Sequence, residues 1–170
     1  MRMKRISITL LTIVASAVQL FAYVTPESGK VYRIHNVKSD KVISEDCIAR
    51  QLASVDAAGN DDFKQLWLLK ESNNGYTIQN AYSGQYLHHC AQQSTRIYPT
   101  GAEEAVLYLT QVNGTQYAIG QASGAYLHLD GSNNIVRWYD EANTGSQWQF
   151  EEVNVSSEAI SLQQAAFQKH

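Results

Sequence analysis

The sequence predicts an all-β domain built from three copies of one strand pattern, a repeat of about 40 residues. The copies share a Tyr-x-Ile opening, found at Tyr32–Ile34, Tyr76–Ile78 and Tyr117–Ile119. A large apolar residue closes each copy, at Trp67, Leu107 and Trp148. The openings and the closing residues recur along the chain with nearly the same spacing. Two independent landmarks with one period indicate an internal repeat.

In each copy the opening strand runs into a short turn and then into a second apolar pair. The turns are Ser39-Asp40, Ser83-Gly84 and Ser123-Gly124. The apolar pairs are Val42-Ile43, Tyr86-Leu87 and Tyr126-Leu127. Glycine tolerates positive φ, and Ser and Asp hydrogen-bond the local backbone, so these residues suit tight turns. Each copy therefore begins with a predicted β-hairpin.

The closing segments alternate large apolar and other residues with a period of two. The pairs are Trp67 and Leu69, Leu107 and Leu109, and Trp148 and Phe150. This spacing places both members on one face of a strand, and we expect them to form the core. The same period excludes helical repeats, and three blades are fewer than propellers use. We expect three four-strand units to close on one another.

Residues 1–22 are predicted to be a secretory signal peptide. Arg2, Lys4 and Arg5 precede an apolar run from Ile6 to about Val14. Cleavage after Ala17 or after Ala22 satisfies the small-residue rule. A membrane anchor needs about 20 apolar residues, which this run lacks. We therefore expect a secreted product that is extracellular, periplasmic or at the cell surface, with no membrane association after processing.

The rest of the chain suits one domain, residues 23–153, followed by a tail, residues 154–170. Ser156, Ser157 and Glu158 are suited to cap a helix that runs to Phe167. That helix either docks on the domain or begins a further domain that has been lost downstream. Cys47 and Cys90 fall at matching places in two repeats. Whether they form a disulfide stays open.

The charge balance argues against a nucleic-acid partner. The full chain holds 13 Lys and Arg against 16 Asp and Glu. Removal of residues 1–22 takes three basic residues and leaves a net charge near −6. Nucleic-acid binding normally requires a basic face, and no Lys/Arg cluster is left.

The motifs together resemble one protein family. The Tyr-x-Ile openings, Gly84 to Leu87 and the Gln-x-Trp at Gln65 to Trp67 resemble the ricin-B-like lectins over residues 30–153. The segments Tyr126 to Gly131 and Gln147 to Val153 look like modules of secreted bacterial proteins. The resemblance implies a β-trefoil of three repeats. It also implies a non-catalytic domain that binds a glycan or polysaccharide.

The third repeat offers the best carbohydrate site. A sugar needs an exposed aromatic platform and convergent polar groups. Trp138 and Tyr139 resemble the family's stacking strand, while His128 follows the Tyr-Leu pair where family members carry Asp. Neutral His accepts only one hydrogen bond, so Asp130 is expected to substitute for the missing acceptor. Gly145-Ser146 replaces the family's Asn-Gln, and Gln147 or Asn143 is a candidate for that contact after a one-residue shift.

The second repeat offers a weaker site, with His88 and Tyr98 as its sugar contacts. The first repeat has Ser44 and no aromatic near residues 55–57, so we expect it to bind no sugar. The run His88-His89-Cys90 invites a zinc site, but neighbouring strand residues point to opposite faces, and structural zinc needs four ligands. We expect no metal and no cofactor.

Two other functions compete with carbohydrate binding. A protein-interacting or protease-inhibiting trefoil would dock on a protein partner through an exposed loop, because fold alone does not decide function. An enzyme would need a constellation such as Asp140, Glu141 and His128. The sequence holds no G-x-S-x-G nucleophile motif, and we expect no enzymatic activity.

Overall fold

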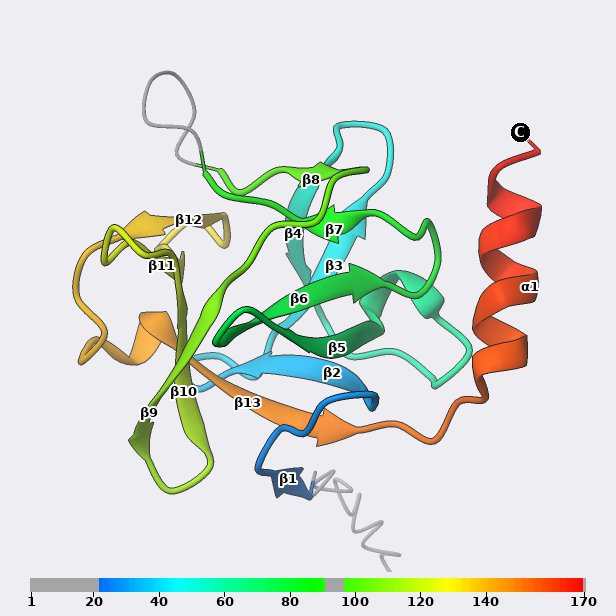
Figure 1. Ribbon diagram of the computed structural model, residues 1–170. Helices are drawn as coiled ribbons and strands as arrows, with labels where there is room; N and C mark the ends of the chain where they lie inside the picture. The colour runs from blue at the N-terminus through cyan, green and yellow to red at the C-terminus, as the bar shows by residue number, and fades with distance from the viewer. Residues whose placement is uncertain (1–21, 91–96, 170) are drawn as a thin grey trace, which may run out of the picture.

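The computed structural model describes residues 22–90 and 97–169 as a β-rich body with one C-terminal helix (Figure 1). The predicted signal peptide lies, apart from Ala22, outside the described residues. The strands are β1 Tyr23–Val24, β2 Val31–Asn36, β3 Val42–Asp46, β4 Gln51–Val55, β5 Trp67–Ser72, β6 Gly75–Asn80, β7 Tyr86–Leu87, β8 Thr100–Gly101, β9 Tyr108–Asn113, β10 Gln116–Gly120, β11 Tyr126–Leu129, β12 Ile135–Trp138 and β13 Gln147–Glu152. The helix is α1, Ser157–Phe167, and two 3₁₀ turns span Phe63–Gln65 and Thr144–Ser146.

Six strands close into an antiparallel barrel. Strand β2 pairs with β5, β5 with β6, β9 with β10, β10 with β13, and β13 with β2. A bridge between Tyr76 and Leu107 joins β6 to the start of β9 and completes the ring. Closure leaves the barrel without a free edge.

Three hairpins cap one end of this barrel, one from each repeat. They are β3–β4, β7–β8 and β11–β12. Bridges between Gln51 and Pro99 and between Ile97 and Val136 join neighbouring hairpins. The six barrel strands and three hairpins make a β-trefoil, which confirms the fold that the family resemblance implies.

The register of the barrel repeats with the sequence. Tyr32 lies opposite Trp67, Tyr76 opposite Leu107, and Tyr117 opposite Trp148. Each opening tyrosine therefore faces the closing residue of its own repeat. The prediction that these six residues occupy equivalent positions is confirmed.

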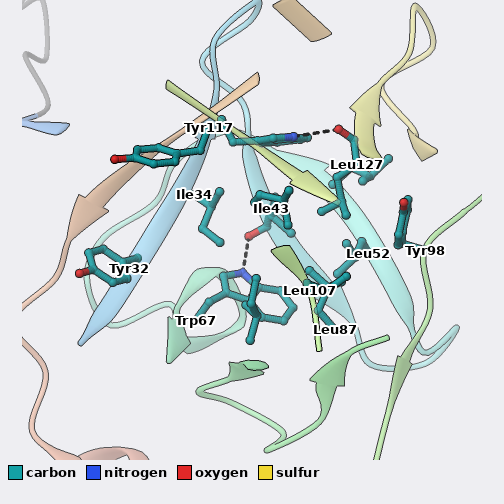
Figure 2. Packing of buried hydrophobic residues seen from close by; sticks show 14 of the residues in the cluster. Tyr32, Ile34, Ile43, Leu52, Trp67, Leu87, Tyr98, Leu107, Tyr117 and Leu127 are labelled. Carbon is teal, nitrogen blue, oxygen red and sulfur yellow. Dashed lines mark hydrogen bonds between the residues drawn. The ribbon is translucent and has the colours of Figure 1, made fainter. Parts of the chain in front are cut away.

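The closing residues form the centre of the core. Trp67, Leu107 and Trp148 have no exposed surface. The Trp67 Nε1 donates to the Ile43 carbonyl oxygen (2.9 Å), and the Trp148 Nε1 donates to that of Leu127 (3.0 Å; Figure 2). Ile43 and Leu127 are the second members of the apolar pairs, so each tryptophan ties its barrel strand to its own hairpin.

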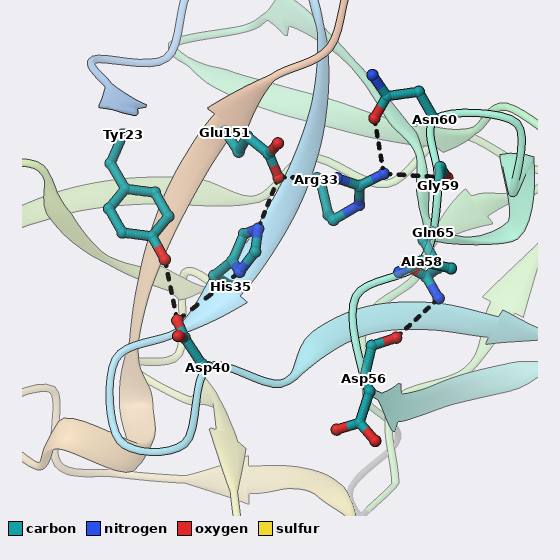
Figure 3. A network of polar contacts seen from close by, with 10 residues as sticks. All are labelled: Tyr23, Arg33, His35, Asp40, Asp56, Ala58, Gly59, Asn60, Gln65 and Glu151. Atoms are coloured by element: carbon teal, nitrogen blue, oxygen red, sulfur yellow. Dashed lines mark hydrogen bonds and ion pairs between the residues drawn. The ribbon is translucent and has the colours of Figure 1, made fainter. Parts of the chain in front are cut away.

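A buried polar network joins β2 to β13. Glu151 Oε2 accepts from Arg33 Nη1 (2.9 Å) and contacts His35 Nε2 (2.8 Å; Figure 3). Arg33 Nη2 also donates to the Gly59 carbonyl oxygen and to Asn60 Oδ1. Both Arg33 and His35 are buried. One partly exposed carboxylate therefore serves two buried basic side chains.

The C-terminal helix docks on the trefoil. Ile160 is buried in a second apolar cluster with Val31, Leu66, Ala81 and Val153. The hydroxyl of Ser156 accepts from the Ala159 amide (3.1 Å), which confirms the predicted N-cap. No helix of the described residues is long and apolar enough to cross a membrane.

Candidate functional site

Trp138 ends β12 on the third hairpin. It lies opposite Tyr126, and 42% of its surface is exposed. Large exposed aromatics are uncommon in a folded domain because burial of their apolar surface is favourable. The position is therefore suited to contact a ligand.

His128 covers one face of Trp138. The two rings are stacked, with centroids 5.2 Å apart and planes 25° apart. His128 Nδ1 lies 2.9 Å from Ser146 Oγ. A Cβ on Gly145 would lie 2.6 Å from His128 Cε1, so only glycine leaves room for this ring. His128 thus supports the platform from behind and is itself buried.

The protein environment keeps His128 neutral over a wider pH range. Burial lowers its pKa below the ordinary histidine value, and the charge of Lys38 lowers it further. The carboxylates of Asp130 and Asp140 oppose this shift only partly. A neutral imidazole packs against an indole without a desolvated charge.

Asp130 closes the turn between β11 and β12. Its Oδ1 accepts from the amides of Ser132 (2.8 Å) and Asn134 (2.9 Å), and its Oδ2 from Asn134 Nδ2 (3.3 Å). Burial raises its pKa, but the bonds from Asn134 and Ser132 outweigh burial and hold the pKa below the usual value. Both oxygens accept bonds within the turn, and Oδ2, with a single bond at 3.3 Å, keeps acceptor capacity for a ligand hydroxyl.

Asn143 and Tyr139 are the remaining predicted contacts of the third repeat. Asn143 Oδ1 accepts from the Gly145 amide (2.9 Å) and caps the second 3₁₀ turn, which leaves its Nδ2 for a ligand. Tyr139 is 64% exposed, and the Arg137 guanidinium lies 5.6 Å from its ring centroid. Arg137 is not among the residues predicted from the sequence, although its i, i+2 spacing to Tyr139 on a strand indicates a shared face.

The second repeat has no equivalent aromatic, which corrects the expectation for Tyr98. Tyr98 has no exposed surface and packs in the core. In the hairpin register, Gly101 lies opposite Tyr86, as Trp138 lies opposite Tyr126. His88 follows Leu87 as His128 follows Leu127, so the two histidines are equivalent. A Cβ on Gly101 would lie 3.3 Å from the His88 ring. His88 therefore lies beside a glycine where His128 stacks on a tryptophan.

The first repeat has Val55 at this position, opposite Val42. The three hairpins therefore present Val55, Gly101 and Trp138 at one equivalent place. Only the third offers an aromatic platform among these positions.

Comparison with known proteins places the fold. Residues 17–97, just under half of the chain, match the family model described as ricin-type beta-trefoil lectin domain-like. The Macrolepiota procera ricin B-like lectin, solved in complex with lactose, superposes with a TM-score of 0.66 at 18% identity, over 76% of this chain and 100% of that chain. The chain has the β-trefoil fold and is similar to the ricin-B-like lectins.

Other solved structures share this trefoil. The Rhizoctonia solani agglutinin has a TM-score of 0.66 at 20% identity, over 78% of this chain and 100% of that chain. A GlcNAcα1-4Gal-releasing endo-β-galactosidase from Clostridium perfringens has a TM-score of 0.64 at 16% identity, over 74% of this chain but 33% of that chain. No curated protein matches the sequence. The β-trefoil fold thus spans the whole of these two lectin chains and one third of the enzyme chain.

Among the described residues of the trefoil, no cluster of three His, Cys, Asp or Glu side chains is placed to hold a metal ion. Cys47 and Cys90 form no disulfide with each other. Burial, followed by the charge of Glu45, raises the pKa of Cys47 to about 11, and burial raises that of Cys90. Both thiols are therefore protonated at neutral pH, which disfavours a nucleophilic role.

Proposed function

We propose that this trefoil is a carbohydrate-binding module whose site lies on the third repeat around Trp138. The observation that carries the proposal is the exposed Trp138 ring at a hairpin position where the other repeats have Val55 and Gly101. Carbohydrate rings present a C–H face that stacks on aromatic side chains. The free face of Trp138 is suited to this contact.

The polar groups of the site favour a donor-rich mode of binding. Asn143 offers its Nδ2, while the family's acceptor position holds His128, which Trp138 and Ser146 already engage. A bidentate carboxylate grip on two hydroxyls is therefore replaced by stacking with few hydrogen bonds. We expect weak binding of single sugars, strengthened in glycans that extend along the hairpin.

Secretion and the lack of catalysis are parts of the same proposal. The basic and apolar pattern of residues 1–22 supports export, and N-terminal sequencing of the secreted product tests it. The protonated thiols give no support to a nucleophilic mechanism. Assays of the purified chain on polysaccharides test the catalytic alternative.

The decisive experiment is a glycan array followed by calorimetry on the sugars that bind, with lactose included. Trp138→Ala should weaken binding at least tenfold, equivalent to about 1.4 kcal/mol. Tyr108→Ala is the matched control, because Tyr108 is 38% exposed on β9 and lies outside the site. Equal affinity of Trp138→Ala and the native protein would reject this site.

A second candidate function, docking on a protein such as a protease, is favoured by Ile48. Ile48 is 97% exposed at the tip of the β3–β4 hairpin. Asp46 Oδ1 accepts from the amides of Ile48 and Ala49, both at 3.0 Å, and fixes the tip. An apolar side chain on a rigid tip is suited to enter a partner's pocket. Inhibition of a protease panel that Ile48→Asp abolishes would support this function.

A further inference from the structure

The trefoil contains two equivalent junctions between neighbouring repeats. One lies between the first and second repeats, where the β3–β4 hairpin meets β7–β8. The other lies between the second and third repeats, where β7–β8 meets β11–β12. The strand registers match the hairpins residue by residue. Leu52 lies opposite Glu45 in the first hairpin, as Ile135 lies opposite Leu129 in the third. The two junctions can therefore be compared directly.

The first junction contains a carboxylate of the protein itself. Glu45 is buried, with 3% of its surface exposed. Its Oε1 accepts from Thr100 Oγ1 (2.8 Å), and its Oε2 accepts from the Ser83 hydroxyl and from Cys47 Sγ (3.6 Å). Donors from the second repeat thus bind a carboxylate that the first repeat supplies.

The second junction keeps the donors and lacks the carboxylate. Thr100 lies opposite Leu87 and Arg137 lies opposite Leu127, so Arg137 takes the place of Thr100. Ser123 takes the place of Ser83 in the turn before the hairpin. His89, two residues after Leu87, takes the place of Glu45, two residues after Ile43.

Arg137 finds no acceptor among the described residues of this junction. Within residues 22–90 and 97–169 its guanidinium has no hydrogen bond and no ion pair, and it contacts the Tyr139 ring instead. A partly buried guanidinium without an anion is unusual, because arginine offers five donors in a fork that matches a carboxylate.

Gln121 is a second donor without an acceptor in the part of the chain that the structure describes. The equivalent Asn36 and Asn80 donate to backbone carbonyl oxygens, Asn36 to that of Gly145 (2.9 Å) and Asn80 to that of Lys64 (2.9 Å). Gln121 Nε2 is buried and has no partner in the described residues. Asn80 also donates to the Leu66 carbonyl oxygen (3.4 Å), the residue before Trp67. The equivalent carbonyl in the next repeat is that of Val106, before Leu107, and it accepts from His89 Nε2 (2.8 Å).

Arg137, Gln121 and His89 line one cavity of about 250 Å³, together with Ser123 and Tyr139. One water occupies about 30 Å³ of liquid, so the cavity admits a carboxylate with part of the group that bears it. The exposed Tyr139 ring stands at the cavity and offers a face for a sugar ring.

We propose that this cavity binds the carboxylate of an acidic sugar, a uronic or a sialic acid, through Arg137 and Ser123 with Tyr139 against the ring. The inference rests on the proposed carbohydrate-binding function and adds a second site with its own ligand class. A sugar carboxylate here takes the place that Glu45 holds at the first junction. The site lies beside Arg137 and Tyr139, separate from the stack of Trp138 on His128.

The test measures binding by saturation-transfer NMR and calorimetry. The probes are galacturonic acid, glucuronic acid and N-acetylneuraminic acid, with galactose, glucose and methyl galacturonate as neutral partners. We expect the acids to bind at least tenfold more tightly than the neutral partners. Arg137→Gln should remove this preference. Arg50→Gln is the matched control, because Arg50 is an exposed arginine at the first junction.

A second variant tests the comparison of junctions. His89→Glu places a carboxylate where Glu45 stands in the first junction and should abolish binding of the acids by occupying Arg137. Near-ultraviolet circular dichroism checks that both variants keep the native fold.

The outcomes separate two failures. Binding of neutral sugars with no preference for acids, or a preference that Arg137→Gln retains, overturns this inference alone. Absence of binding by every sugar overturns it together with the proposed function. Equal binding of N-acetyl-glutamate would show that the cavity recognises a carboxylate without a sugar, as on a protein partner, and would also reject the acidic-sugar assignment.

Discussion

The His128 imidazole lies flat on the Trp138 indole, with 5.2 Å between the ring centroids. This contact makes the exposed platform a two-ring unit, in which the buried histidine fixes the orientation of the tryptophan. The platform therefore depends on a group whose charge changes near neutral pH. The first prediction follows from this dependence.

Acidification should destabilise the protein through His128. Its pKa is lower in the folded than in the unfolded chain, where it is about 6.5. The unfolded chain therefore binds the proton first, and stability falls as the pH drops below about 6.5 towards the folded pKa. The measurement is the melting temperature between pH 7.5 and 5. His128→Gln should show a smaller decrease over this range, and an identical decrease would contradict the prediction.

Loss of a closing tryptophan should cost much of the stability. Trp148→Ala leaves a core cavity and removes the bond from Nε1 to the Leu127 carbonyl. We expect the free energy of unfolding to fall by about 3–5 kcal/mol, measured by urea denaturation. Ile48→Ala, at a 97% exposed residue, is the control and should change it by less than about 0.5 kcal/mol. Similar losses in both variants would argue against the assigned core.

Removal of Glu151 should also be costly. Glu151→Ala leaves Arg33 and His35 buried without their shared carboxylate. An uncompensated buried charge typically costs about 3–5 kcal/mol. Glu152→Ala is the matched control, because Glu152 pairs with Lys30 at the surface (3.1 Å), where such pairs contribute about 0–1 kcal/mol. Chemical denaturation of both variants distinguishes the two cases, and equal effects would refute the prediction.

The C-terminal helix should contribute to stability through one residue. Ile160→Ala removes the side chain that α1 buries against Val31 and Leu66, and we expect a loss of about 2 kcal/mol. Leu162→Ala, on the same helix but 66% exposed, should change stability by less than about 0.5 kcal/mol. If the two variants melt alike, the helix does not dock as described.

The fold could be predicted from sequence because its signals are repeated and local. The period of two at Trp67 and Trp148, and the Tyr-x-Ile openings, each specify a strand face, and three copies leave few ways to bury those faces. The helix cap at Ser156 was predictable for the same reason, because a cap depends on a few neighbouring residues.

The site was harder to predict because it depends on hairpin length. Tyr98 follows Leu87 at the same spacing at which Trp138 follows Leu127, so the two aromatics look equivalent in the sequence. The second hairpin is longer, and its register pairs Leu87 with Thr100, whereas Leu127 pairs with Arg137. Equal spacing therefore places one ring in the core and the other at the surface.

The interactions of polar side chains were not predictable from residue type. Asp130 closes a turn, and His128 stacks on an indole, although each residue type is also common in sugar sites. Orientation depends on neighbours that are distant in the sequence, such as Gly145 beside His128. The type of a residue therefore does not predict which distant residues it contacts.

Because Glu45 and His89 occupy equivalent hairpin positions, two residues after Ile43 and Leu87, a change of one residue can alter one junction while the barrel stays intact. Leu129 occupies the equivalent position in the third repeat, two residues after Leu127. A scaffold of this kind can acquire new chemistry in one third of its body, while the remaining two thirds preserve foldability. Exchange of residues among positions 45, 89 and 129 offers a direct route to engineered variants with altered ligand charge.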